Sequence, residues 1–545
     1  MTTSPLNPRP VGQIIRAMIV VAGSSATAML IGLAKNVLAA FYFGTSSGMD
    51  AYFIALQLPE MVIQLSRTGA FNFIPVFAAE RERSVPDAWR IAGRMLTYWL
   101  SLLLLILLVA IVAAPALMPL LAPGFSAEQR HLTLELTRGL FFVSAIFGTS
   151  RILSVVLQAH KRFFMIGLAD VGMQLSSLVF LVVFHEMGVE ALVGGQILGS
   201  SLHLAVVLVS LLPYRRLLRP RLDIGSGTVH RLIRLNAPVY VGDVGNKVNQ
   251  FVIRALSSLL PTGAVSSLQY AYYPVEGINR MLASQFIAAF FPFLSIQFAK
   301  KDQQEARQSF VRAISAITVV FLPIAALIWI LSEPMIILLF ERGRFDQSSR
   351  EMTSSALRLY APALFALALN ELLGSASHAR QDTVTPMKAG LFRVATNVLL
   401  CLALTPLLGH RGLALATTVS LYLKLFALLW LSREILDRVE WRLTFRDLFK
   451  VFMAVGVAFL GMLLLLELAY PRAWIEDHAL RSMVAIGLLG LVSYLICLRL
   501  FAPSQFSLYL GIVRRMNPWS SRRRSFEGAA SDLARAGATA EGEKS

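Results

Sequence analysis

Residues Met95 to Leu121 read MLTYWLSLLLLILLVAIVAAPALMPLL, a run without one charged side chain. About 20 apolar residues suffice for an α-helix to cross the hydrocarbon core of a bilayer. In that core every backbone amide and carbonyl needs a partner within the protein, and a helix supplies one for each. The stretch therefore predicts a membrane-spanning helix.

Similar runs recur along the whole chain of 545 residues, which is 56% hydrophobic and only 15% charged. Soluble domains contain roughly 25% charged residues. The sequence thus predicts an all-α polytopic membrane protein with about fourteen transmembrane helices. We expect them near residues 15–43, 51–78, 95–121, 132–158, 163–185, 188–213, 231–260, 264–298, 308–331, 350–377, 386–408, 412–432, 448–470 and 481–501.

The connections between these helices alternate in charge. Those after even-numbered helices are rich in Lys and Arg, and those after odd-numbered helices hold far fewer. Basic loops stay in the cytoplasm, so both termini are predicted to be cytoplasmic. The net charge of +18 follows the same alternation. We therefore interpret it as a topology signal and expect the bilayer, not a nucleic acid, as the partner of this basic chain.

Two parts of the chain, one in each half, echo each other. Ala-Pro-Gly-Phe ends at Phe125 and Leu-Phe-Glu-Arg-Gly-Arg-Phe ends at Phe345, each after a predicted helix. An offset of six helices preserves orientation, which predicts two parallel six-helix lobes. The predicted organisation is a cytoplasmic N-terminal tail (1–14), a first lobe (15–213), a cytoplasmic linker (214–230), a second lobe (231–432), a final helix pair (433–501) and a basic cytoplasmic tail (502–545).

Charged side chains inside spanning helices are energetically costly and mark candidate functional sites. The paired helices 1, 2, 7 and 8 of the two lobes carry an excess of cations, and Lys and Arg both bind phosphate. This pattern predicts a transporter with a central cleft for an amphipathic substrate that bears phosphate. The candidate substrate-binding residues are Lys35, Asp50, Arg67, Lys247, Arg254, Glu276 and Arg280.

Structural interpretations remain open beside this one. Asp243 with Lys247, and Glu276 with Arg280, have the i,i+4 spacing of local ion pairs, and Asp50 is placed to cap the second helix. The sequence contains no phosphate-binding loop and no motif of a metalloprotease or serine hydrolase, so we do not expect an enzyme. We expect no cofactor and no metal site, while coupling to the membrane potential or to an ion stays open.

Several motifs together resemble the MurJ (MviN) family. They are Gly32-Leu-Ala-Lys35-Asn36, Phe43-Gly44, Asp50-Ala51-Tyr52-Phe53, Leu58-Pro59, Gly69-Ala70-Phe71, Pro75, Ala122-Pro123-Gly124-Phe125, Arg162-Phe163, Phe340-Glu341-Arg342-Gly343-Arg344-Phe345 and Arg380-Gln381-Asp382-Thr383-Val384-Thr385-Pro386. The resemblance covers residues 15 to 500. It implies fourteen helices, within the multidrug/oligosaccharidyl-lipid/polysaccharide exporter superfamily.

The resemblance also implies a function. Its members flip lipid II, an undecaprenyl-diphosphate-linked peptidoglycan precursor, across the bacterial inner membrane. Asp50 and Glu276 match family acids, and Lys35 stands where the family has an arginine. The expected partner is therefore a polyprenyl-diphosphate-linked glycan, carried by alternating access. Two alternatives remain: a flippase for an exopolysaccharide or O-antigen repeat unit, and a cation-coupled small-molecule exporter.

Overall fold

Long α-helices make up almost all of the computed structural model, which describes residues 8–71, 77, 80–160, 162–214, 227–299, 303–380, 382–433, 441–469 and 478–516. Within these ranges no residue is assigned to a β-strand. Contacts divide the chain into two units. The first comprises residues 1–291 and 332–433, and the second comprises residues 292–331 and 434–545.

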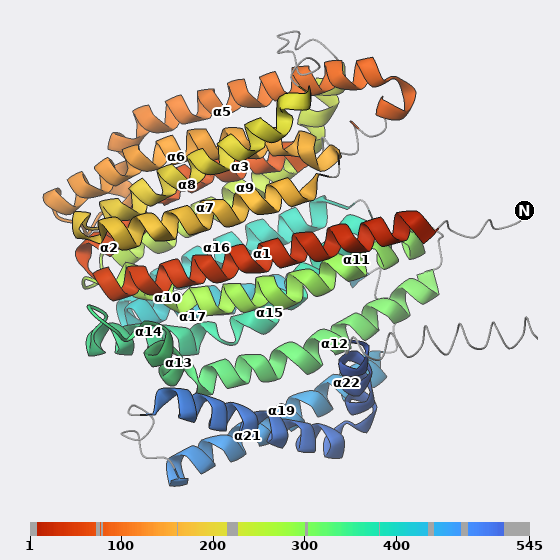
Figure 1. Ribbon diagram of the computed structural model, residues 1–545. Helices are drawn as coiled ribbons and strands as arrows, with labels where there is room; N and C mark the ends of the chain where they lie inside the picture. The colour runs from red at the N-terminus through yellow and green to blue at the C-terminus, as the bar shows by residue number, and fades with distance from the viewer. Residues whose placement is uncertain are drawn as a thin grey trace, which may run out of the picture. The chain divides into compact units, whose positions relative to one another are not determined.

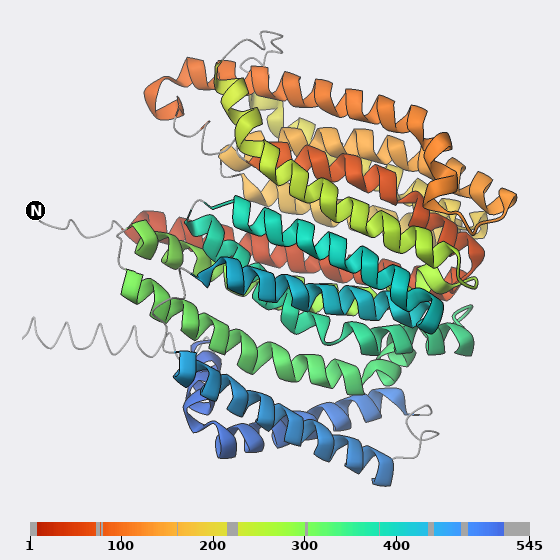
Figure 2. The ribbon, with the colours of Figure 1, turned by 180° about the vertical axis from the view of Figure 1, so that it is seen from behind.

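The first unit contains the helices of both predicted lobes except one (Figures 1 and 2). In its first part these are α1 (Pro8–Phe43), α2 (Ser47–Ala55), α3 (Gln57–Phe71), α5 (Val85–Leu121), α6 (Ala127–Ala159), α7 (Phe163–Phe184) and α8 (Glu190–Leu211). In its second part they are α9 (Gly227–Ser258), α10 (Ala264–Ile278), η3 (Asn279–Ala283), α13 (Ser332–Phe340), α14 (Gln347–Tyr360), α15 (Ala363–Ala379), α16 (Val384–Leu408) and α17 (His410–Leu431). Helix α11 (Ser284–Ala299) runs from the first unit into the second.

Each predicted span corresponds to one or more helices where the structure describes it. Ten described helices are long and apolar enough to cross a membrane, and α14 with α15 adds an eleventh as a pair bent by 43°. The bend lies at Pro362, which the sequence prediction of one helix over 350–377 did not anticipate. Proline is tolerated in the first turn of a helix but interrupts a helix interior. The all-α polytopic membrane fold is confirmed.

Three predicted spans, 51–78, 231–260 and 264–298, are helical in their described parts but fall outside this apolar set. They correspond to α2 with α3, to α9, and to α10 with α11. A π-helical segment, η3, interrupts the third of them. Such bulges occur frequently at functional sites. These are the segments that carry Asp50, Lys247, Arg254, Glu276 and Arg280, so the polar helices are also the candidate site helices.

Helices α6, α7 and α8 pack side by side in the first lobe (Figure 1). Small residues allow α7 and α8 to approach closely. The Ser177 hydroxyl donates to the Gly195 carbonyl at 2.8 Å, and a Cβ at Gly199 would meet the Met173 carbonyl oxygen at 2.6 Å. Small residues at helix contacts are typical of membrane bundles.

Helices α9, α16 and α17 pack together in the second lobe, the latter two in teal in Figure 2. A buried hydrogen bond joins two of them, since the Asn397 amide donates to the Asn249 side-chain oxygen at 2.6 Å. Both side chains are almost fully excluded from solvent. In a low-dielectric interior such a hydrogen bond favours one register of the two helices.

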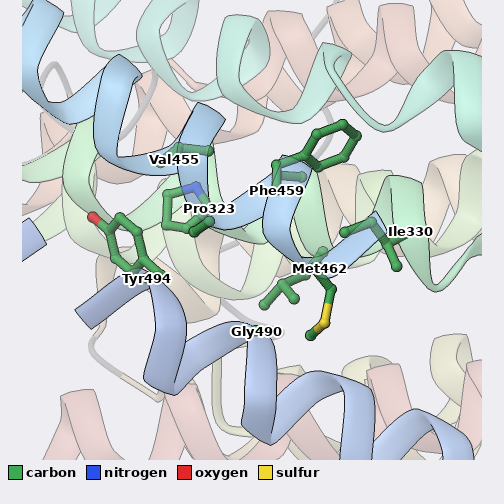
Figure 3. Close-up of a pocket in the computed structure, with 10 residues that line it drawn as sticks. Pro323, Ile330, Val455, Phe459, Met462, Gly490 and Tyr494 are labelled. Carbon is green, nitrogen blue, oxygen red and sulfur yellow. The ribbon is translucent and has the colours of Figure 1, made fainter. Parts of the chain in front are cut away.

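The second unit packs α12 (Gln303–Ile330), α19 (Trp441–Ala469), α21 (Ala479–Phe501) and α22 (Pro503–Met516) together. The Tyr494 hydroxyl of α21 donates to the Val319 carbonyl of α12 at 2.7 Å. An apolar pocket lies beside this contact, and Figure 3 shows Pro323, Phe459 and Met462 around it. This unit thus has an apolar core of its own.

The repeat that the sequence predicts is visible in the helix caps. Ser126 caps α6 in the first lobe, and Asp346 caps α14 in the second. Each follows one of the two loops quoted above, and each accepts a hydrogen bond from the backbone amide three positions further on. The positions of these caps agree with the repeat, while the predicted domain boundaries stay a prediction.

Candidate functional site

Asp50 is buried in α2 and caps a helix of the other lobe. Its carboxylate accepts hydrogen bonds from the Gly263 amide at 2.6 Å, the Ser266 amide at 2.8 Å and the Ser266 hydroxyl at 2.7 Å. These amides belong to the start of α10, where backbone donors lack partners within the helix. A carboxylate there also interacts favourably with the helix dipole.

The alternative that Asp50 caps its own helix is wrong. The N-cap of α2 is Ser46, whose hydroxyl accepts from the Met49 amide at 3.4 Å. The N-cap of α10 is Gly263, which has no side chain that could accept a hydrogen bond. Asp50 therefore supplies across the lobes the cap that α10 lacks.

Four segments meet at this end of the first unit, and we call them the closed end: residues 41–50, 122–126, 257–266 and 340–350. The Arg344 amide donates to the Phe41 carbonyl at 2.9 Å. On the repeat-related side, the Gly124 amide donates to the Ser258 hydroxyl at 3.3 Å. The first contact joins the end of α1 to the loop before α14, and the second joins the loop before α6 to the end of α9. The two contacts are equivalent when the lobes are exchanged, as expected for lobes related by a twofold axis.

Glycines permit this close approach. Gly44 has a φ of +57°, and a Cβ there would lie 2.3 Å from the Arg344 carbonyl oxygen. A Cβ at Gly124 would lie 2.1 Å from the Ser258 carbonyl oxygen. Both partners are backbone atoms that cannot rotate away, so any larger residue forces the loops apart. The glycines of the two family-like motifs thus have a physical role in closure.

Lys247 of α9 in the second lobe makes another contact with the first lobe. Its ammonium lies 3.3 Å from the Glu60 carboxylate of α3 and donates to the Gln250 amide oxygen at 3.1 Å. The partner of Lys247 is therefore Glu60, which the candidate site residues omitted. The side chain of Asp243, the local partner considered from the sequence, lies outside the described residues.

Arg254 lies between α9, α10 and α2. Its guanidinium donates to the Val265 carbonyl at 3.2 Å and to the Gln269 side-chain oxygen. It also sits 5.8 Å from the centre of the Phe53 ring, a cation–π arrangement. These partners are neutral, so they position the guanidinium without neutralising its charge.

Glu276 and Arg280 form the local ion pair that their spacing allows, at 2.5 Å. The side chains are nonetheless 41% and 66% exposed, although both lie well inside the helical run from 264 to 299. Charged groups exposed to hydrocarbon are strongly disfavoured. Both side chains therefore need a polar surrounding beside α10 and η3.

Lys35 lies in α1, where its ammonium approaches the Gln174 amide oxygen of α7 at 3.5 Å. It makes no ion pair with a carboxylate in the described part of the chain. Arg67 belongs to α3, but its side chain lies outside the described residues. The structure thus brings Asp50, Lys247 and Arg254 to the α2–α3–α9–α10 region, while Lys35 sits against α7.

The candidate site residues named from the sequence omit Ser266, Gly263 and Glu60. Ser266, Gly263 and Glu60 act through contacts with the opposite lobe, far away along the chain. The Pro-Thr-Gly turn at 261–263 was the only available signal for the first two. Among the described residues no group of three His, Cys, Asp or Glu is suited to a metal, and the absence of a cofactor stays a prediction.

Comparisons with known proteins find similar solved structures, sequence relatives and a matching family model. A solved structure described as "Lipid II flippase MurJ, inward closed conformation" matches with a TM-score of 0.72 at 19% identity, covering 89% of this chain and 99% of that one. An inward-facing multidrug resistance MATE family transporter of the MOP superfamily matches with a TM-score of 0.60 at 15% identity, covering 76% and 99%. At these identities the two structures show the fold.

Sequence relatives and the family model show more. A probable lipid II flippase MurJ from Rhizobium tropici is 28% identical over 422 residues, covering 75% of this chain and 78% of the relative. The model of the family described as "Lipid II flippase MurJ" matches residues 39–484. The predicted resemblance and the prediction of a membrane transporter in place of an enzyme are confirmed, and the chain belongs to the lipid II flippase MurJ family.

Proposed function

We propose that this protein flips lipid II from the cytoplasmic to the periplasmic leaflet of the bacterial inner membrane by alternating access. Family membership supports the cargo. The exposed charges of Glu276 and Arg280 inside a spanning segment carry the proposal in the structure. They require a polar surrounding within the membrane, and a water-filled space there accommodates a polar headgroup while the lipid tail remains in the bilayer.

The cations near this space suit a diphosphate. Lys35 and Arg254 are held by neutral groups, Gln174 and Gln269, and so retain their charge for an anion. Arg binds phosphate with a planar fork and Lys as a point charge. Lys247 and Arg280 are paired with carboxylates, which keeps the empty site near neutrality and lets a diphosphate exchange for the acids.

The charge of the loops supports an orientation. With both termini in the cytoplasm, the closed end lies at the periplasmic side. The lobes then meet on the periplasmic side, and the site is reached from the cytoplasm. Transport requires the contacts of Asp50, Gly44 and Gly124 to break after the headgroup has bound.

The test is a reconstituted flipping assay. Proteoliposomes with lipid II in one leaflet are treated with an impermeant reagent that modifies only headgroups in the opposite leaflet. We expect protein-dependent exposure of lipid II that falls at least about tenfold in K35A and R254A. R90A, in an exposed pair with Asp87, is the matched control and should transport normally.

Depletion of the protein in its host distinguishes lipid II from the alternative cargoes. For lipid II, depletion should cause lysis with the precursor accumulating on the cytoplasmic side. Normal growth with loss of capsule, slime or O-antigen would reject lipid II in favour of an exopolysaccharide or O-antigen repeat unit.

A further inference from the structure

A second polar cluster lies inside the first lobe, away from the closed end. His203 of α8 has no exposed surface. Its Nδ1 lies 2.6 Å from the Ser150 hydroxyl of α6, and its Nε2 lies 3.3 Å from the Asp170 carboxylate of α7. Arg151 of α6 donates to the same carboxylate oxygen at 3.0 Å. Three adjacent helices thus contribute to one buried network.

The network is not required for packing alone. Replacing a buried ion pair with apolar residues of similar size is often neutral or stabilising. Helices α7 and α8 already pack through small residues such as Ser177 and Gly199. A histidine between a hydroxyl and a carboxylate therefore calls for a chemical role.

We propose that His203 and Asp170 form a proton-binding site whose occupancy is linked to anion binding near Lys35. The proposal goes beyond flipping itself, because it assigns a coupling ion to named residues. Histidine is the one side chain whose unperturbed pKa places its change of charge between about pH 5 and 8.

The geometry accepts a proton without movement of heavy atoms. A serine hydroxyl donates to an unprotonated ring nitrogen and, after rotation, accepts from a protonated one. Ser150 can therefore satisfy Nδ1 in both states. On the other side, Nε2 makes no well-aligned hydrogen bond although it is buried beside Asp170. A positive ring strengthens its interaction with that carboxylate.

The charged groups around the His203 ring determine the net charge of the cluster before and after protonation. Arg151 and Asp170 balance each other, so a neutral His203 leaves the cluster neutral and a protonated one leaves it at +1. The side chains of Arg151 and Asp170 are 28% exposed, which gives the proton a polar route to the ring. Other titratable groups also pack against α8. The Tyr52 hydroxyl accepts from Gln196 of α8, and Tyr214 lies in η2 (Leu212–Tyr214) at the C-terminal end of α8. The titratable groups of η1 (His185–Met187) lie beside its first turn, roughly 20 Å along the helix from His203 at 1.5 Å per residue.

The link to the candidate site runs along α7. Asp170 and Gln174 are one turn apart, and Gln174 holds the Lys35 ammonium at 3.5 Å. A proton on His203 adds positive charge beside Asp170, which lies one helical turn from Gln174. Anion binding at Lys35 and proton binding at His203 therefore favour each other, and such coupling is reciprocal.

The first measurement needs no cargo. The full chain in nanodiscs, labelled with ¹⁵N-histidine, is titrated from pH 5 to 8.5, and the His203 resonance is identified by its loss in H203Q. We expect one buried imidazole to titrate in this range, with a midpoint at lower pH in D170N because the stabilising carboxylate is lost. S150A retains the ring and should also shift the midpoint. An unchanged His203 resonance over the whole range overturns the site, whether or not the protein flips lipid II.

The second measurement tests the linkage with geranylgeranyl diphosphate as the probe. Its affinity should rise about fivefold or more from pH 8 to pH 6, the lower end of typical coupling, and H203Q should abolish this rise. The exposed His131, near Glu135, provides the matched control H131Q, which should keep the rise. An equal pH dependence in H203Q and the unmodified chain refutes the linkage, while loss of lipid II transport with an intact titration refutes only the proposed cargo.

Discussion

The carboxylate of Asp50 accepts two hydrogen bonds from Ser266, at 2.8 Å from its amide and 2.7 Å from its hydroxyl. One side chain of the first lobe thus caps a helix of the second. The contact therefore stabilises the packing of the two lobes at the closed end.

Replacing Asp50 should therefore loosen the closed end. Loss of an N-cap costs about 1–2 kcal/mol, equivalent to a factor of about 5–30 in an equilibrium. In D50A, amide hydrogen exchange at 263–266 should accelerate by that factor. D50N retains one acceptor and should fall between. Unchanged protection of these amides in D50A would show that α10 does not depend on this cap.

Alanine substitutions at Gly44 and Gly409 provide a matched test of the steric role of Gly44 at the closed end. Both have a positive φ, +57° and +58°, but an added Cβ meets a backbone oxygen only at Gly44. G409A should show only the strain of a backbone with φ +58° and ψ −135°, about 1–3 kcal/mol. G44A should in addition expose the Arg344 amide to exchange and lower the closed population. Equal exchange at Arg344 in the two variants would contradict the steric argument.

A disulfide should lock the closed end. The hydroxyl oxygens of Thr45 and Ser349 lie 2.7 Å apart, close enough for two cysteines at these positions to bond. With Cys401 and Cys497 replaced, oxidised T45C/S349C should flip at least about tenfold less lipid II, and a reductant should restore transport. Each single cysteine variant is the control. Full activity in the oxidised double variant would mean that this end need not open.

The Lys247–Glu60 pair should contribute modestly. Its side chains are 16% and 47% exposed, and solvent screening limits such a pair to about 0.2–1 kcal/mol. A double-mutant cycle of E60Q and K247Q on thermal unfolding should return a coupling in that range. The charge swap E60K/K247E should recover part of it. Strict additivity of the single variants would show that the contact contributes nothing.

Acid should weaken the cap of α14. Hydrogen bonds from the Ser349 hydroxyl and amide hold the pKa of Asp346 below its ordinary value of 3.8. A carboxyl with a lowered pKa stabilises the fold above its ordinary pKa, and this contribution is lost as the pH falls through the folded value. Exchange at Ser349 should thus rise below pH 3.8. In D346N the rise should be absent at that amide.

The all-helical membrane fold could be predicted from the sequence alone, because span length and backbone satisfaction are local properties of runs such as Met95–Leu121. The internal repeat and the family motifs could also be recognised in the sequence. Local spacing also anticipated the Glu276–Arg280 pair, since i,i+4 neighbours meet on any helix.

Which groups meet across the lobes could be read only from the packing of the helices. Asp50 had an attractive partner in its own helix and Lys247 a candidate one turn away, yet their contacts lie in α10 and α3. His203 was indistinguishable from a packing residue until α6 and α7 placed Ser150 and Asp170 around it. A helix fixes neighbours within a turn, whereas partners on distant helices depend on how those helices pack.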